Sequence, residues 1–163
     1  MGGIGMNIKK FTQNSLQAVQ AMEKVAYEYG NQEIEQEHLL YALLTQDDSL
    51  ILKLLEKMNI QKELFINRVE EALSKRPKVQ GGQVFIGQDL NKVLIHAEDE
   101  AKQMGDEYVS VEHLFLALIK YANKEIKAIF KSNSLGIFLK TIDVLCNIPE
   151  SSVKLKLKGN VKE

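Results

Sequence analysis

The strongest constraint on this chain is an eight-residue segment that occurs twice. Residues 37–44 read EHLLYALL, and residues 112–119 read EHLFLALI, 75 positions further on. Both segments are apolar on every face of a helix, and a helix without a polar side must be enclosed by other elements. The sequence therefore predicts two central helices, one in each half of the chain, with the remaining segments packed around them.

The residues around these segments repeat at the same spacing. The matching pairs include Thr12 and Gly87, Val19 and Leu94, Ala26 and Ala101, Gly30 and Gly105, and Ile51 and Ile126. Such self-similarity indicates a tandem duplication of one structural unit, and two copies are too few for a solenoid. We therefore predict an all-α fold of about eight helices, in which two pseudo-symmetric four-helix repeats form one compact bundle.

Hydrophobic periodicity and capping residues predict where the helices lie. Expected helices cover about 12–29, 37–46, 50–58, 61–75, 88–104, 112–119, 124–131 and part of 132–147. Thr12 and Ser110 are predicted N-caps, and Gly30 is predicted to end the first helix. Leu64, Phe65, Val69, Ala72 and Leu73 are expected to face inward on the fourth helix. Tyr27 and Ile95 fall outside the apolar stripes, so solvent exposure is expected for both.

The predicted domain organisation follows from the repeat and from a Pro- and Gly-containing connector. Residues 1–10 are expected to be a flexible leader, in which residues 1–5 are an addition before a natural start at Met6. Repeat 1 covers 11–75, the linker 76–86 and repeat 2 87–147, and these three segments form one domain. Residues 148–163 are a tail or the start of an interdomain linker, either a short strand or a disordered basic end.

After Lys131 the two halves match less well, and two registers remain open. One keeps the equal offset and pairs Leu139 with Leu64 and Val144 with Val69. The other pairs residues 136–137 with residues 59–60.

Composition excludes several classes of function. The net charge is −1, so no overall field attracts nucleic acid or an anionic membrane. No apolar run approaches the roughly 18 residues of a membrane span, and no signal-peptide pattern is present. The single cysteine, Cys146, has no partner for an internal disulfide, which fits a reducing compartment. We interpret Cys146 as a small buried hydrophobic residue, with a reactive thiol as the alternative.

The sequence lacks the residue patterns of the common catalytic sites. Gly81 and Gly82 are not followed by the Lys of a phosphate-binding loop, and no Gly-x-Ser-x-Gly motif is present. His38 and His113 occupy equivalent positions at the start of the two central helices. We predict that each imidazole bonds back onto the loop that starts its helix, because clustered metal ligands are absent; catalysis or metal binding is the alternative.

The doubled segment, each copy preceded by a glycine and a short loop, resembles the Clp N-terminal repeat domain. The second copy with its loop, GDEYVSVEHLFLALI at 105–119, and the linker KRPKVQGGQ at 75–83 are most similar to the form found in ClpB-type AAA+ disaggregases. The resemblance covers about residues 6–131. Beyond Lys131 the chain departs from the family pattern, which leaves the last helix and the tail undetermined.

The resemblance implies a chaperone function in the cytoplasm, in stress response and protein refolding. It implies a domain that engages unfolded or aggregated polypeptide as part of a ClpB hexamer, while ATP and Mg²⁺ bind in modules absent from this chain. The residues that match the family's substrate contacts are Thr12, Asp106 and Glu112, and Leu94 and Ile95 are our candidates for the apolar floor of the groove. No cofactor, metal, nucleic acid or membrane is expected, and the isolated domain should be monomeric.

Two other classes of function remain as alternatives. An adaptor-docking module, as in ClpA- and ClpC-type unfoldases, would use the same helical surface to receive a folded partner. A free-standing enzyme is disfavoured, because no nucleophile–base pair or metal-ligand set is apparent in the sequence.

Overall fold

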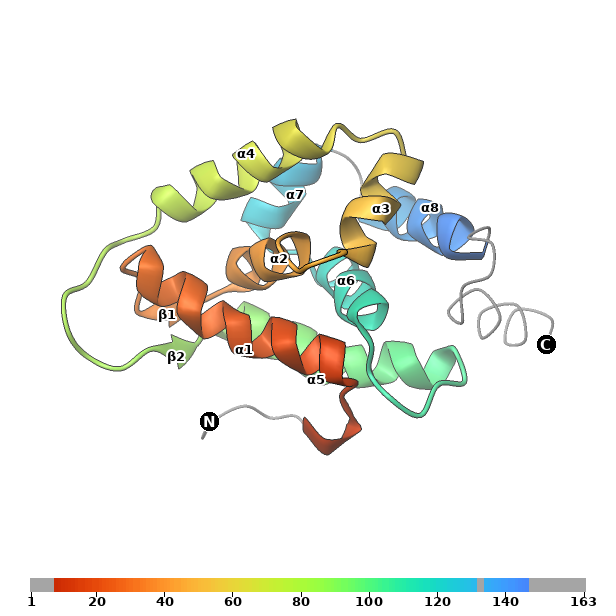
Figure 1. The fold of residues 1–163 in the computed structure, drawn as a ribbon, viewed down its shortest axis with the longest axis horizontal. Coiled ribbons are helices and arrows are strands. Elements are labelled where there is room, and N and C mark those ends of the chain that lie inside the picture. The colour runs from red at the N-terminus through yellow and green to blue at the C-terminus, as the bar shows by residue number, and fades with distance from the viewer. Residues whose placement is uncertain (1–7, 132–133, 147–163) are drawn as a thin grey trace.

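The computed structural model describes residues 8–131 and 134–146, and within them it contains eight α-helices (Figure 1). They are α1 (Gln13–Glu28), α2 (Gln36–Leu44), α3 (Leu50–Lys57), α4 (Lys62–Ser74), α5 (Gln88–Gln103), α6 (Val111–Lys120), α7 (Lys124–Phe130) and α8 (Ser134–Cys146). A 3-10 turn, η1 (Ile8–Lys10), precedes α1, and two short strands are β1 (Glu33–Ile34) and β2 (Phe85–Ile86). The predicted all-α fold is confirmed; the proposed tail at 148–163 lies outside the described residues.

The doubled segments form the two central helices, α2 and α6, as predicted. Every residue of α2 except Tyr41 is buried, and so is every residue of α6 except Lys120. The helix contacts follow the pseudo-symmetry: α1 packs on α2 as α5 packs on α6, and α4 packs on α2 as α8 packs on α6. The two central helices also contact each other, so both repeats share one hydrophobic core.

Local sequence signals set the ends of the helices. Thr12 is the N-cap of α1, and its hydroxyl accepts a hydrogen bond from the Ser15 amide at 3.2 Å. Gly30 ends the helix in the left-handed region, with φ 71°, where glycine has no steric penalty. Ser110 caps α6 as predicted. Tyr27 and Ile95 are exposed, also as predicted.

The predictions for the fourth and eighth helices need correction. Leu64 points to solvent, because the inward stripe of α4 repeats every four residues from Phe65 and leaves Leu64 outside it. In α8 the buried positions lie 72 residues after those of α4, so neither predicted register is correct. The matching buried residues are Phe65, Val69 and Leu73 in α4, and Ile137, Thr141 and Leu145 in α8.

The change of register arises around α7. In repeat 1, Ile51 is followed after eight residues by Asn59 in the left-handed conformation. In repeat 2, Ile126 is followed after five residues by Lys131 in the same conformation. Repeat 2 is therefore three residues shorter at this point, and the shift carries through α8.

The two repeats exchange backbone hydrogen bonds at two equivalent places. The strand before α5 pairs in parallel with the strand before α2, with Ile86 opposite Ile34, and the Gly87 amide donates to Ile34 O at 2.8 Å. The segment before α1 pairs with the segment before α6 in the same way: Phe11 lies opposite Val109, and the Thr12 amide donates to Val109 O at 2.9 Å. Each repeat thus supplies the support on which the first helix of the other begins.

Gly87, the counterpart of Thr12, is the N-cap of α5 and has no side chain with which to cap it. The carboxylate of Glu35, from the other repeat, takes over this role: its Oε1 accepts from the Leu90 amide at 3.0 Å and from the Gln36 amide at 3.1 Å. A Cβ at Gly87 would overlap Glu35 Oε2. Gly87 is therefore required because the Glu35 carboxylate occupies the space of a side chain.

We expect Gly87→Ala to destabilise the chain by about 1–3 kcal/mol, because the buried Glu35 side chain must move away from two helix N-termini. Gly136→Ala is the matched control: it lies in α8, where an added Cβ meets nothing within 4 Å, and it should stabilise by up to about 1 kcal/mol through helix propensity. Urea unfolding of both variants measures the difference. Equal effects of the two substitutions would contradict the role given to Glu35.

Candidate functional site

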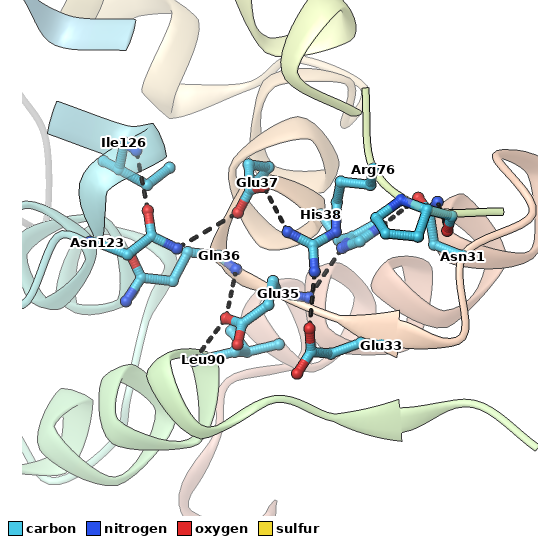
Figure 2. A network of polar contacts seen from close by, with 11 residues as sticks. Asn31, Glu33, Glu35, Gln36, Glu37, His38, Arg76, Leu90, Asn123 and Ile126 are labelled. Atoms are coloured by element: carbon cyan, nitrogen blue, oxygen red, sulfur yellow. Dashed lines mark hydrogen bonds and ion pairs between the residues drawn. The ribbon is translucent and has the colours of Figure 1, made fainter. Parts of the chain in front are cut away.

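The joint between the repeats is a network of buried polar side chains (Figure 2). Gln36, which is fully buried, donates from Nε2 to Asp89 O at 3.0 Å and to Tyr121 O at 2.9 Å. Its Oε1 accepts from the Asn123 amide at 2.8 Å. All polar atoms of the amide are therefore used to connect α2 with the start of α5, the end of α6 and the start of α7. This is a structural role.

A second part of the network joins the connector to α2. The Arg76 guanidinium donates from Nη1 to Glu37 Oε2 at 2.9 Å and from Nη2 to Glu33 Oε1 at 2.8 Å (Figure 2). The Glu37 side chain is almost completely buried. A buried carboxylate needs a cation and hydrogen-bond donors, and Arg76 supplies both. The pairing of Glu37 with Arg76 was not predicted from the sequence.

Glu35 and His38 have strongly shifted pKa values, a feature that often marks functional residues. Burial raises the pKa of Glu35 to about 7, with Asp89 and Glu33 adding to the effect. Burial also lowers the pKa of His38 to about 4. Both side chains, however, bond to backbone or amide groups within the joint. The shifts therefore reflect packing between repeats.

We expect Glu35→Gln to stabilise the chain at pH 8 by about 1–3 kcal/mol, and by progressively less as the pH falls towards 5. The folded pKa of Glu35, about 7, lies above its ordinary value of 4.5. Stability is therefore lost as the pH rises from about 4.5 to about 7, because the unfolded chain ionises in this range while the folded carboxyl keeps its proton. Glutamine retains the accepting Oε1 and carries no charge.

Titration of His38 changes the stability in the opposite direction. The folded pKa of His38 lies below its ordinary value of 6.5, so stability is lost as the pH falls from 6.5 towards 4. Comparing variant with parent at each pH, by urea unfolding, cancels this second effect. A difference that stays constant from pH 5 to pH 8 would refute the prediction for Glu35.

The two equivalent histidines both bond back onto the loops that precede their helices, as predicted. His38 Nδ1 accepts from the Glu35 amide at 2.8 Å, and His113 Nδ1 accepts from the Ser110 amide at 2.8 Å. A nitrogen that accepts an amide hydrogen carries no proton, so each imidazole is neutral with its hydrogen on Nε2. Each histidine therefore fixes the first turn of its helix against the preceding loop.

The partners of the two Nε2 atoms differ between the repeats. His38 Nε2 lies 3.0 Å from Asn31 Oδ1, and His113 Nε2 lies 2.8 Å from Asp106 Oδ2. An amide in repeat 1 is thus replaced by a carboxylate in repeat 2. Within residues 8–131 and 134–146, no group of three His, Cys, Asp or Glu side chains is arranged to hold a metal ion.

The Asn31–His38 pair in repeat 1 suggests a substitution that tests the Asp106–His113 pair in repeat 2. We expect Asp106→Asn to change stability by less than about 1 kcal/mol, because an amide oxygen accepts from His113 as Asn31 does from His38. Asp106→Ala should cost about 1–3 kcal/mol, because it removes an acceptor from a fully buried imidazole. Thermal unfolding of both variants checks this, and equal losses would show that the charge, not the hydrogen bond, matters for folding.

A hollow of about 150 Å³ lies beside Asp106, and it is the part of the predicted groove that the structure contains. Its lining comes from η1, the last turns of α5 and the loop before α6: Lys10, Glu98, Ala101, Lys102, Asp106, Glu107 and Val109. Three apolar side chains close to these residues in sequence are exposed, namely Ile8, Ile95 and Tyr108. Ile95, Glu98 and Lys102 share one face of α5, because they are spaced three and four residues apart.

The structure brings only some of the predicted site residues to this hollow. Asp106 lines it with a side chain that is 4% exposed and bonds inward to His113, and Thr12 adjoins it through its hydrogen bond to Val109. Ile95 is exposed on the same face of α5. Leu94, by contrast, is fully buried, because it belongs to the core stripe of α5, so its prediction as the groove floor is wrong. Glu112 is 3% exposed and lies in the enclosed start of α6, so it does not form a surface edge.

Sequence reasoning missed the charged residues of the lining. Glu98 and Lys102 carried a usable signal, since both fall on the solvent face of a predicted helix in line with Ile95. Lys10 carried none, because its position depends on the pairing of Phe11 with Val109.

Residues 10–133 match the Clp repeat (R) N-terminal domain family, and the chain therefore belongs to it. A ClpB chaperone from Nitratidesulfovibrio vulgaris is 43% identical over 120 residues, which are 71% of this chain and 14% of that protein. A ClpB chaperone from Porphyromonas gingivalis is 39% identical over 70% of this chain and 13% of its own length. The chain thus spans about one seventh of the length of these relatives.

Solved structures show the same fold. The N-terminal domain of Hsp104 from Candida albicans has a TM-score of 0.75 at 22% identity, covering 90% of this chain and 99% of that one. A structure described as a complex of the ClpV N-domain with a VipB peptide has a TM-score of 0.67 at 18% identity, covering 88% and 92%. The matched region is the N-terminal repeat domain and not an ATPase module. In the described part of the chain, no helix is both long and apolar enough to cross a membrane.

Proposed function

We propose that this chain engages unfolded or aggregated polypeptide as the N-terminal domain of a ClpB-type, ATP-dependent disaggregase in the cytoplasm. Family membership and the identity to ClpB chaperones support this proposal. ATP and Mg²⁺ would bind in other modules of the whole protein, and this domain would carry out no bond chemistry.

The hollow beside Asp106 is the proposed contact for the client, and it carries the proposal. Its lining combines the acidic Glu98, Asp106 and Glu107 with the basic Lys10 and Lys102, and exposed apolar side chains lie next to it. A volume of about 150 Å³ holds one side chain and not a folded surface. Affinity for a single segment would therefore be low, and several copies in a hexameric ring would provide avidity.

We expect Ile95→Ser to weaken binding of an unfolded client about tenfold, since a buried apolar side chain contributes roughly 1.5 kcal/mol or more. Tyr27→Ser is the matched control: Tyr27 is 81% exposed, but it lies near the opposite end of α1 from the hollow. Fluorescence anisotropy with a labelled, permanently unfolded chain gives the affinities. In parallel, amide NMR shifts should occur at Thr12, Ile95 and Asp106.

Equal weakening by both serine substitutions would indicate nonspecific hydrophobic capture and reject the hollow as the site. An absence of shifts around Asp106 at saturating client would do the same. ATP hydrolysis by this chain should be undetectable, and measurable hydrolysis would overturn the non-enzymatic role.

Adaptor docking is the second candidate, because a protein of this fold, the ClpV N-domain, has been solved in complex with a VipB peptide. The two functions differ in the conformation of the ligand. Immobilised chain should retain a reduced, unfolded protein and release it when the same protein is folded. Retention of folded partners alone would favour adaptor docking.

A further inference from the structure

A larger hollow, of about 510 Å³, lies on another face of the domain, between α4, α7 and the connector after α4. Figure 1 shows α4 and α7 on one side of the central helices α2 and α6, and α5 on the other. The two hollows share no lining residue. The larger hollow is therefore separate from the client site proposed above.

The charged residues of this hollow do not balance. Two cations are paired with carboxylates of the same lining: Arg76 with Glu37 at 2.9 Å, and Lys75 with Glu71 at 3.0 Å. The remaining charged groups are Arg68 and Lys131 against one carboxylate, Glu125. The lining itself therefore holds four cations against three carboxylates, and Glu33, the second partner of Arg76, lies outside the lining.

Arg68 is half-buried in the lining and makes no ion pair with any described residue. Its guanidinium donates from Nη1 to Ile129 O at 3.4 Å, which is long for a hydrogen bond. A guanidinium has five N–H donors in a planar fork that fits a carboxylate. Arg68 thus lies in the lining, and its guanidinium N–H groups have no carboxylate partner among the described residues.

Lys131 reaches the hollow from an unusual backbone conformation. It ends α7 with φ 53°, in the left-handed region that favours Gly and Asn. The corresponding position in repeat 1 is Asn59, with φ 61°, which suits this conformation. Repeat 2 therefore places at this point a residue that fits the backbone less well and contributes a cation to the lining.

We propose that the hollow between α4 and α7 binds an acidic polypeptide segment, whose carboxylate is held by Arg68 and Lys131. Ala72 and Ala128, with the edge of Ile129, provide an apolar surface for one small or medium-sized side chain next to that carboxylate. The Glu37–Arg76 pair holds the base of the hollow in place. Glu125, an exposed residue of the same lining, disfavours a ligand that carries negative charge on every residue.

Two blocked tripeptides test the proposal on the whole 163-residue chain: N-acetylated, C-amidated Asp-Leu-Asp, and its uncharged counterpart Asn-Leu-Asn. NMR titration should show millimolar or tighter binding of the acidic peptide, with shifts at the Arg68 Nε–H and the Lys131 amide. The uncharged peptide should bind at least about fivefold more weakly, because it lacks the charge-assisted hydrogen bonds.

Lys131→Asn is the decisive variant, since asparagine suits the backbone, as Asn59 shows, and the fold should be retained or stabilised. It should weaken binding of the acidic peptide about fivefold or more, as should Arg68→Gln. Lys127→Gln is the matched control: it removes the same charge from an exposed position of α7 outside the hollow and should change the affinity less than twofold.

Equal effects of Lys127→Gln and Lys131→Asn would reduce the result to general electrostatics and overturn the site. Equal binding of both tripeptides would exclude carboxylate recognition. An NMR titration with inorganic phosphate at matched ionic strength is a further test. Shifts of Arg68 and Lys131 with phosphate but not with the acidic tripeptide would show a small-anion site and reject the polypeptide ligand.

Discussion

The reciprocal pairing of backbone between the two repeats is the constraint on which the rest of the structure depends. The amides of Thr12 and Gly87 donate to Val109 O and Ile34 O, so the first helix of each repeat begins on a segment of the other. Buried amides without partners would be costly, and in this structure the acceptors come from the opposite repeat. The duplicated unit therefore folds as one domain with a shared core, and not as two independent domains.

Divergence within this symmetric framework creates the differences between its faces. Glu35 and Ser110 occupy equivalent positions, but Glu35 reaches across to cap α5, which has only Gly87 at its N-cap. Asn31 and Asp106 hold equivalent histidines, one through an amide oxygen and the other through a carboxylate oxygen, and each lies in the lining of a hollow. The backbone pattern is retained in both repeats, whereas the side chains around it give the two joints different charges and hydrogen-bond partners.

Much of the fold followed from local patterns in the sequence. Thr12 and Ser110 cap their helices, and the two histidines bond to the preceding loops, because capping involves residues only three positions apart. The site was predicted less well. Leu94 is a core residue, and Glu112 is enclosed, since matching a family position does not reveal burial. The boundaries proposed for the leader, linker and tail remain predictions.

The sequence by itself determined the duplication, the helices with their inward stripes, and the enclosed character of α2 and α6. These properties depend on periodicity and on neighbours within one or two turns. Only the tertiary structure decided that Glu35 caps a helix 55 residues away, that Arg68 lacks a carboxylate partner in the described chain, and where the two hollows lie. Such features depend on the relative positions of distant segments, which are fixed by packing of the whole core and leave no periodic signal in the sequence.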